Sequence, residues 1–362
     1  MPNTKILAGD CIESLRKLPD ASVNCCVTSP PYFGLRDYGT ATWDGGDPNC
    51  SHKRDSKHSV LTITGHKNLE GAVGDGIYKK VCKQCGAIRI DKQIGLEDSP
   101  EDFINKLVDV FREIKRVLKD DGTCWVNMGD SYFSKQNSNR NGISGSLGGS
   151  VRGGGEYKTQ KRNAGETMCK EKDLIGIPWM LAFALRADGW YLRQDIIWHK
   201  PNPMPESVTD RCTKSHEYIF LLSKSKQYYF DSDAIKTEAK SKSEGIRFGG
   251  NKYGDNDDVK FATKSGNVSK EYNKANKRSV WTVNTKSYRE AHFATYPPEL
   301  ITPCILAGCP EGGTVIDPFG GSGTTAEVAM LNGRNAILCE LNPEYVKIIE
   351  KRLGKVDPLF NS

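Results

Sequence analysis

A glycine-rich loop near the end of the 362-residue chain has the composition of a site for a nucleotide-like cofactor. Residues 315–325 read VIDPFGGSGTT and lie between a predicted strand and a predicted helix. Glycines let the backbone approach a ligand closely, and the first turn of a helix offers unpaired N–H groups to an anion. The next predicted strand ends at Glu340, where a doubly wound sheet places a carboxylate that accepts hydrogen bonds from ribose hydroxyls. Together these features predict cofactor binding, whereas a glycine-rich turn alone would indicate only a tight turn.

The run TSPPY, residues 28–32, is a second candidate centre. It follows the apolar run VNCCVT, which predicts a buried strand that the two prolines end. To methylate an aromatic amine, an enzyme needs acceptors for its N–H bonds, because the nitrogen lone pair is delocalised into the ring. The Ser29 hydroxyl and the Pro30 carbonyl are such acceptors, Pro31 helps to hold that carbonyl, and Tyr32 offers a flat face to an extruded base. The other interpretation is a proline-terminated strand with a structural tyrosine.

Four potential metal ligands occur as two pairs, Cys50-x-His52 and Cys82-x-x-Cys85. Such a set can hold a tetrahedral zinc ion and cross-link a segment that lacks its own core, so we expect a structural zinc. His58 or His66 could replace His52, and free thiols in a loop are the competing interpretation. A catalytic metal is not expected, because four protein ligands close the site. Six other cysteines have apolar or small neighbours and are expected in the core: Cys25, Cys26, Cys124, Cys304, Cys309 and Cys339.

Alternating strands and helices would hold these groups in place. Residues 100–118 have apolar side chains at helical spacing and are followed by the apolar run TCWVNM. Later in the chain, the patterns predict helices at 178–190, 297–309, 323–333 and 342–353, strands at 191–200, 312–319 and 335–341, and a strand pair within 216–230. This alternation is typical of an α/β fold with a doubly wound parallel sheet.

Three stretches interrupt the alternation and divide the chain. Residues 39–95 carry the Cys and His pairs, residues 134–172 form a Gly-rich segment expected to be mobile, and residues 235–290 are polar and rich in lysine. We therefore divide the chain into five parts: residues 1–38 with TSPPY, the insertion 39–95 with the zinc-knuckle pattern, residues 96–234, the lysine-rich region 235–290, and residues 291–362 with the glycine-rich loop.

Charge and hydropathy narrow the class of protein. The net charge of +6 is compatible with a polyanionic partner without requiring one. No apolar run reaches the roughly 18 residues of a membrane span, and the N-terminus has no signal-peptide pattern, so we expect a cytoplasmic protein that does not contact membranes. Twelve cysteines in such a chain indicate reduced thiols.

The two motifs resemble those of the DNA amino-methyltransferases, in the order called the β class, with TSPPY first and DPFGGSGTT last. The resemblance extends to LAGDCIESLRKLPDASVNCCVTSPPY, REIKRVLKDDGTCWVNMGD, DIIWHKPNPMP, HEYIFLLSKSKQYYF and AHFATYPPEL, which together cover more than half of the chain. It implies a Rossmann-like methyltransferase sheet that forms a catalytic domain from residues 1–38, 96–234 and 291–362, with the cofactor-binding part in 291–362. Residues 235–290 would be the target-recognition insertion, and the inserted zinc-binding segment is expected from the Cys and His pairs alone.

The resemblance also implies roles for individual residues. Ser29, Pro30, Pro31 and Tyr32 would form the pocket for a target base flipped out of double-stranded DNA. Asp10 would contact the adenine of S-adenosylmethionine and Glu340 its ribose. The remaining cofactor residues would surround its methionine part: Asp317, Phe319, Gly320, Gly323, Thr324 and Thr325. Direct transfer of the methyl group to the amine would make a nucleophilic cysteine unnecessary.

In this family Ser-Pro-Pro-Tyr is more typical of cytosine N4 modification, and Asp-Pro-Pro-Tyr or Asn-Pro-Pro-Tyr of adenine N6 modification. We therefore expect a site-specific cytosine-N4 DNA methyltransferase, with adenine N6 as the alternative. RNA or small-molecule methylation and a non-catalytic DNA-binding role remain further alternatives. A restriction-modification, orphan or phage setting and a monomer or homodimer are all left open.

Overall fold

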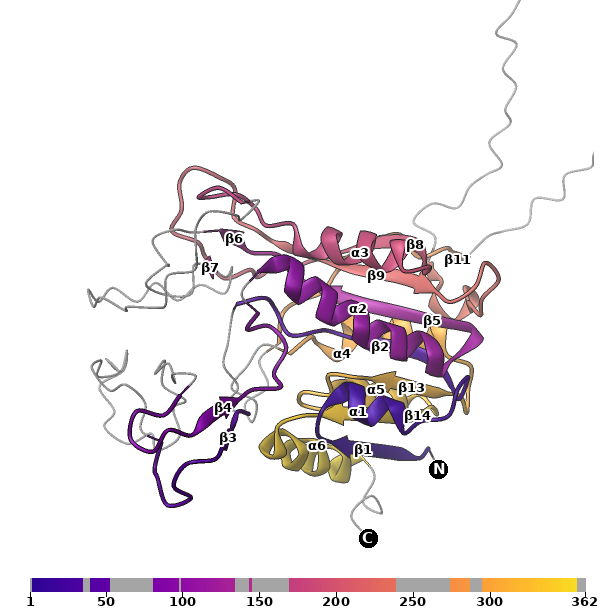
Figure 1. Cartoon of the computed structure of the whole chain (residues 1–362). Helices are drawn as coiled ribbons and strands as arrows, with labels where there is room; N and C mark the ends of the chain where they lie inside the picture. Colours follow the sequence, from indigo (N-terminus) through magenta and orange to yellow (C-terminus); the bar gives the residue numbers. More distant parts are fainter. Residues whose placement is uncertain are drawn as a thin grey trace, which may run out of the picture.

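The computed structural model describes residues 2–34, 40–52, 81–97, 99–133, 143–144, 169–238, 274–286 and 295–356. Its centre is an eight-stranded sheet in the order β1-β14-β13-β2-β5-β9-β8-β12 (Figure 1). In chain order these strands are β1 Thr4–Ala8, β2 Val23–Thr28, β5 Leu118–Met128, β8 Tyr191–His199, β9 His216–Ser223, β12 Val280–Thr282, β13 Thr314–Asp317 and β14 Asn335–Glu340.

The sheet is mostly parallel. β1, β14, β13, β2 and β5 pair in parallel, and β12 pairs in parallel with β8. β9 is antiparallel to both of its neighbours, β5 and β8. The carboxyl ends of β1, β14, β13, β2, β5 and β8 therefore lie at one edge of the sheet, together with the start of β9.

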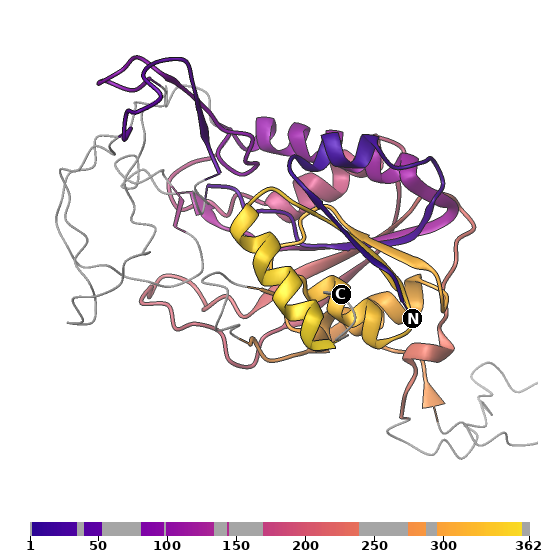
Figure 2. The same cartoon turned by 90° about the horizontal axis from the view of Figure 1, so that it is seen from below.

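Helices cover both faces of the sheet (Figures 1 and 2). One apolar cluster joins α1, α2 and α3 to the first face, and a second joins α4, α5 and α6 to the other. Their bounds are α1 Cys11–Arg16, α2 Pro100–Val117, α3 Ile177–Ala187, α4 Pro298–Gly308, α5 Thr324–Leu331 and α6 Pro343–Val356. In the strand order, the unit β13-α5-β14 extends toward the β1 edge of the sheet, whereas the unit β2-α2-β5 extends toward the β12 edge. The switch point, where such sheets bind ligands, therefore lies between β13 and β2.

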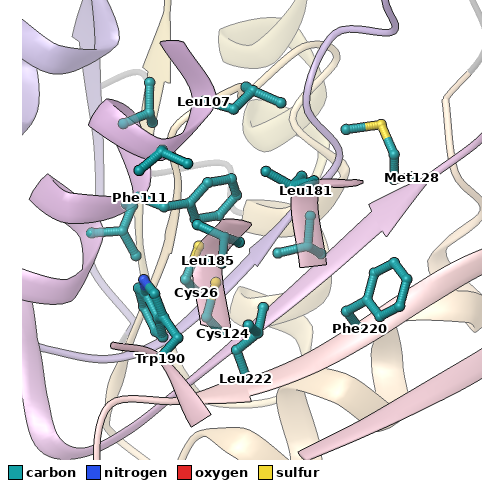
Figure 3. Packing of buried hydrophobic residues seen from close by; sticks show 14 of the residues in the cluster. Cys26, Leu107, Phe111, Cys124, Met128, Leu181, Leu185, Trp190, Phe220 and Leu222 are labelled. Atoms are coloured by element: carbon teal, nitrogen blue, oxygen red, sulfur yellow. The ribbon is translucent and has the colours of Figure 1, made fainter. Parts of the chain in front are cut away.

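The core on the first face is packed from both helices and strands (Figure 3). Ser99 caps the start of α2, because its side chain accepts a hydrogen bond from the Asp102 amide. The helix then places Phe103, Leu107 and Phe111 against the sheet. Cys26 and Cys124 face this cluster from β2 and β5. All six cysteines expected in the core are buried, which confirms that prediction.

Most predicted elements are present, and the differences have physical causes. The strand pair expected within 216–230 is wrong: β9 is one strand, and the residues after Ser223 do not form another. Both edges of β9 are already occupied by β5 and β8, so no edge is free for a hairpin partner. The parallel sheet expected from the alternation is likewise corrected to a mixed one. β1, α1 and β12 had not been predicted.

Small strand pairs lie outside the main sheet. They are β3 Thr42–Asp44 with β4 Ile88–Ile90, β6 Tyr132–Phe133 with β7 Ile143–Ser144, and β10 Thr237–Glu238 with β11 Lys274–Ala275. A 3-10 helix spans Asp233–Ile235. Among the helices in the described part of the chain, none has the length and apolar character needed to cross a membrane.

Candidate active site

A cleft of about 550 Å³ opens at the carboxyl edge of the sheet, within the size range of small-molecule sites. Loops that follow β1, β2, β5, β13 and β14 line it, as do the end of β8 and the start of β9. Nine of the twelve predicted catalytic and cofactor residues line this cleft: Asp10, Ser29, Pro30, Pro31, Tyr32, Phe319, Gly320, Thr324 and Glu340. Segments about 300 residues apart in the chain thus form one cleft.

The other three, Asp317, Gly323 and Thr325, lie behind the lining. Asp317 is fully buried and accepts hydrogen bonds from the hydroxyls of Thr28 at 2.6 Å, Thr325 at 2.6 Å and Tyr296 at 3.0 Å. Burial raises the pKa of Asp317 to about 6, and these donors act against that rise. Asp317 therefore joins the end of β13 to the end of β2.

Gly323 has a structural reason to be glycine. Its φ of 81° lies in the left-handed region, and a Cβ there would come within 3.1 Å of the Ile349 side chain on α6. The residue ends the glycine loop and begins α5. Gly323 thus shapes the loop without reaching the cleft.

The Glu340 carboxylate fixes the glycine loop from the end of β14. One oxygen accepts a hydrogen bond from the Gly321 amide at 2.7 Å and the other from the Asn342 amide at 2.8 Å. Burial raises the pKa of Glu340 to about 7, and the two amides oppose that shift. Each carboxylate oxygen can accept more than one hydrogen bond, so Glu340 keeps acceptor capacity for a ligand in the cleft.

Arg352, on α6, supports the same loop and was not predicted. Its guanidinium donates to the Ser322 carbonyl at 3.2 Å and to the Thr324 hydroxyl at 3.0 Å, and it pairs with Glu327 at 2.5 Å. Arg352 is 6% exposed, and a charge so deeply buried requires a paired carboxylate and hydrogen-bond acceptors of this kind. A single arginine in an amphipathic helix gave no sequence signal for this role.

The Ser29–Tyr32 loop lines the same cleft. The Tyr32 hydroxyl donates to the Glu217 carboxylate on β9 at 2.7 Å. Burial, followed by the Glu217 charge, raises the pKa of Tyr32 well above its usual value. Tyr32 therefore remains protonated, with its hydroxyl held at the start of β9.

Two cysteines also line the cleft, Cys11 and Cys339. Burial raises the pKa of Cys11 to about 12, and that of Cys339 is raised well above its usual value by the same cause. Both stay in the thiol form at neutral pH, which is the poorly nucleophilic form.

The predicted metal ligands Cys50, His52, Cys82 and Cys85 come together in the insertion. Their ligand atoms all lie within 4.8 Å of one another. The Sγ atoms of Cys50 and Cys82 are 3.8 Å apart, and Cys85 Sγ is 3.6 Å from His52 Nδ1. Tetrahedral zinc with bonds of about 2.3 Å to sulfur separates its ligand atoms by roughly 3.8 Å. The donor set and its spacing therefore fit zinc.

Backbone strain accompanies this cluster. His52 has a φ of 40°, in the left-handed region that non-glycine residues rarely adopt. Its ring stacks on Trp43 of β3, with centroids 4.4 Å apart and an interplanar angle of 9°. Such strain persists only where the surrounding contacts determine the conformation, and here it directs the imidazole toward Cys85.

The insertion also reaches the cleft. Residues 92–94, which follow β4, line it, and Lys92 pairs with Glu13 of α1 at 2.7 Å. The Gly34 amide donates to the Gly95 carbonyl at 2.7 Å, which joins the insertion to the chain just after Tyr32. β3 and β4 thus connect the metal-ligand cluster to one wall of the cleft.

Several predicted features lie outside the described residues. They are the alternative ligands His58 and His66, nearly all of the Gly-rich segment 134–172, and most of the lysine-rich region 235–290.

Comparisons with known proteins agree with this arrangement. The model of the DNA methylase family matches residues 23–351. The chain is 42% identical over 361 residues to the type II methyltransferase M.Cfr9I of Citrobacter freundii, covering 97% of this chain and 88% of that protein. It is 39% identical over 359 residues to the type II methyltransferase M.SmaI of Serratia marcescens, covering 96% and 90%.

Solved structures show the same fold. The PvuII DNA methyltransferase, described as cytosine-N4-specific, aligns with a TM-score of 0.55 and 16% identity over 99% of this chain and 92% of that chain. The putative DNA modification methylase TTHA0409 from Thermus thermophilus, complexed with S-adenosyl-L-methionine, aligns with a TM-score of 0.51 and 19% identity over 98% and 96%. The chain therefore belongs to the N6/N4 DNA methylase family and is an S-adenosylmethionine-dependent DNA methyltransferase.

Proposed function

We propose that this enzyme methylates the exocyclic N4 of cytosine at a specific DNA sequence, on a base flipped out of the duplex. The observation that carries the proposal is the single cleft that joins the Ser29–Tyr32 loop to the glycine loop and Glu340. Serine at the first position of Ser-Pro-Pro-Tyr favours cytosine, and the fold neighbour from PvuII is described as cytosine-N4-specific. Adenine N6 is the alternative within the same enzyme class.

S-adenosylmethionine supplies an electrophilic methyl group on its sulfonium sulfur. The carboxylate of Glu340 would accept hydrogen bonds from the ribose, and Asp10, which also caps α1 and lines the cleft, would contact the adenine. Phe319, Gly320 and Thr324, which line the same cleft, would hold the methionine part. Asp317, Gly323 and Thr325 act indirectly, because they hold the loop from behind.

The target base would lie beside the Ser29–Tyr32 loop, which lines the same cleft. The Ser29 hydroxyl and the Pro30 carbonyl accept hydrogen bonds from the amine, and Tyr32 stacks on the base. The amine nitrogen would form its bond to the methyl carbon as the bond from that carbon to sulfur breaks. S-adenosylhomocysteine would leave and the methylated amine would lose one proton to solvent, so the protein needs no nucleophile. The protonated state of Cys11 and Cys339 supports this role for the cleft.

The test is to incubate purified protein with labelled S-adenosylmethionine and unmethylated genomic DNA, and to identify the modified nucleoside by mass spectrometry after hydrolysis. N4-methylcytosine is the expected product. N6-methyladenine would keep the enzyme class and reverse the target base. A protein that methylates RNA or free nucleosides but not duplex DNA would contradict the proposal.

We further propose that Cys50, His52, Cys82 and Cys85 bind a structural zinc ion, supported by their tetrahedral spacing. Four protein ligands leave no open coordination position, so this ion stabilises the insertion and takes no part in methyl transfer. Elemental analysis of the purified protein should give one zinc per chain. Protein that folds and methylates DNA without stoichiometric metal would refute the site.

Residues 235–290 are proposed as the target-recognition region. Their sequence combines many lysines with interspersed aromatics, which suits phosphate contacts and base-edge contacts together. The Gly-rich segment 134–172 is proposed to order on DNA. A role beside a restriction enzyme is supported by the names of the type II methyltransferases that the chain resembles.

A further inference from the structure

The Tyr32 hydroxyl is held by a carboxylate from a distant part of the chain. Glu217, the second residue of β9, accepts its hydrogen bond at 2.7 Å, and the two residues are 185 positions apart in sequence. The same Glu217 oxygen accepts a second bond, at 3.2 Å, from the side-chain amide of Asn127 on β5. Asn127 also donates to the Tyr218 carbonyl at 3.1 Å, so neighbouring strands fix the acceptor.

Lys200 completes this cluster from the end of β8. Its ammonium group pairs with the other oxygen of Glu217, and the two side chains are only 14% and 12% exposed. Lys200 also lies over the Trp198 ring, 4.3 Å from its centroid. A lone carboxylate at this depth would be costly, and the Lys200 ammonium group compensates that cost where Glu217 meets Tyr32. A charged acceptor makes a stronger and more directional hydrogen bond than a neutral one.

The Tyr32 ring is confined on another side by Gly129. A Cβ built on Gly129 would lie 2.7 Å from Cε2 and 3.1 Å from Cζ of Tyr32, and 3.2 Å from the Glu217 carboxyl carbon. Only a residue without a side chain lets the ring lie this close to the backbone after β5. Packing against Gly129 and the hydrogen bond to Glu217 together fix the plane of the ring.

We propose that Glu217 is a positioning residue that sets the plane of the Tyr32 ring for the flipped base. This inference rests on the proposed stacking role of Tyr32. Stacking requires a ring face parallel to the base, and methyl transfer requires the amine to stay in line with the methyl donor, so a tilted ring reduces the fraction of productive complexes. Glu217 lines the same cleft as Tyr32, and so do Asn127 and Lys200.

A double-mutant cycle tests the coupling. We expect Tyr32→Phe and Glu217→Ala each to lower kcat by about 10- to 100-fold, the range for a hydrogen bond to a charged group. In the Tyr32→Phe background, Glu217→Ala should cause little additional loss, because the bond is already absent. Glu217→Gln keeps an acceptor and should recover part of the loss. The dissociation constant for S-adenosylmethionine should stay within about twofold of the wild-type value in all four variants.

A fluorescence measurement separates ring position from general damage. 2-Aminopurine at the target position, in a duplex containing the sequence that wild-type protein methylates, reports both flipping and stacking. We expect the Glu217→Ala protein still to flip the base, but to quench the 2-aminopurine fluorescence less than the wild-type protein does. The matched control is Glu206→Gln, since Glu206 is 8% exposed, pairs with Arg211 at 2.5 Å and is not part of the described lining of the cleft. This control should retain wild-type kcat and quenching.

Several outcomes would overturn the inference: fully additive losses in the double mutant, wild-type kcat in Glu217→Ala, or an equal loss in Glu206→Gln. Thermal unfolding of Glu217→Gln, which preserves the shape of the side chain, identifies any loss caused by misfolding. If wild-type protein methylates no DNA, the proposed function fails instead. The two failures are therefore distinguishable.

Discussion

At the scale of single residues, the cofactor end of the site depends on two buried carboxylates with different surroundings. Asp317 accepts hydrogen bonds from three hydroxyls and one backbone amide. Glu340 is held by two backbone amides and lines the cleft. The pKa of each is raised by burial, to about 6 for Asp317 and about 7 for Glu340. Glu340 lines the cleft and Asp317 does not, so we expect a ligand in the cleft to change the ionisation of Glu340 alone near neutral pH.

Glu340 should make cofactor binding depend on pH. Its ionised form is the better acceptor for ribose hydroxyls, so affinity should rise as pH increases through about 7. If only the ionised form binds, the dissociation constant should fall about tenfold from pH 6 to pH 8. Isothermal titration calorimetry measures this directly. Glu340→Gln should bind weakly with a flat profile, and an equally steep profile in that variant would assign the dependence to another group.

The raised pKa of Glu340 affects the stability of the fold in the opposite direction: cofactor affinity should rise with pH, whereas stability should fall. The pKa of Glu340 in the folded protein, about 7, lies above its usual value of 4.5. Its protonation therefore contributes stability that is fully present below about 4.5 and is lost as pH rises through about 7. A bound cofactor should reduce that loss, because it favours the ionised carboxylate.

Tyr32→Ala should remove the surface on which the base stacks. Base–aromatic stacking is worth about 1 to 3 kcal/mol, so kcat should fall roughly 5- to 150-fold. Affinity for duplex DNA should change little, because phosphate contacts provide most of it. Steady-state kinetics and a gel-shift titration on the same duplex measure both quantities. Unchanged turnover would exclude Tyr32 from the base pocket.

The sequence predicts the residues that line the cleft better than those that support it. Ser29–Tyr32 and the glycine loop are contiguous motifs, so their residues can be recognised together. Glu217 and Arg352 are isolated side chains whose partners are distant in sequence, and no local pattern marks them. Asp317 belongs to a motif, yet only the fold shows that it bonds to Thr28 beneath the cleft.

At the scale of elements, two antiparallel strands connect a ligand cluster to the cleft. The four candidate metal ligands lie beyond the end of the pair where β3 finishes and β4 begins. Residues 92–94, which line the cleft, follow β4 at the other end of the pair. Ile94 belongs to the main core, whereas Ile88 and Ile90 are exposed. The insertion therefore has few apolar contacts of its own and depends on a cross-link for order.

Replacing Cys82 and Cys85 together by serine should release the metal and loosen this insertion. Hydrogen exchange should increase in residues 40–52 and 81–90, while α5 and β14 keep their protection. The affinity for S-adenosylmethionine should change less than the stability of the insertion, because Ile94 and Gly95 stay anchored to the body. Cys212→Ser is the control, since Cys212 is exposed and lies outside the ligand set. Equal exchange in both variants would argue against a metal cross-link.

The prediction of secondary structure from the sequence failed at segments whose conformation depends on tertiary contacts. The residues after β9 have strand-like composition, but the Tyr229 amide instead donates to the Asp121 carbonyl at 2.8 Å, and the Phe230 ring stacks on Trp125. β9 lies between β5 and β8 and is antiparallel to both. The order and direction of strands in a sheet depend on contacts between distant segments, so the alternation of strands and helices along the sequence did not predict them. The helices were predicted more accurately, because their apolar periodicity is a local property.

At the scale of the whole molecule, the catalytic body and the proposed recognition region meet at a pair of strands. β10 and β11 are antiparallel, and Glu238 is directly opposite Lys274. The residues between them, 239–273, can therefore be replaced by an Asn-Gly turn, which closes a two-residue hairpin. Among the described residues, both apolar clusters of the sheet are formed by other elements, and we expect the body to fold without this segment.

We expect the variant with Asn-Gly in place of 239–273 to separate the two functions. It should unfold cooperatively, bind S-adenosylmethionine with wild-type affinity, and lose methylation of its specific sequence. Calorimetry measures the first two properties, and sequencing of methylated sites measures the third. The matched control replaces the same segment with a Gly-Ser chain of equal length, which keeps the spacing but removes the lysines and aromatics. If either variant still methylated the wild-type sequence, recognition would have to lie in another part of the chain, and the proposed role of residues 235–290 would be wrong.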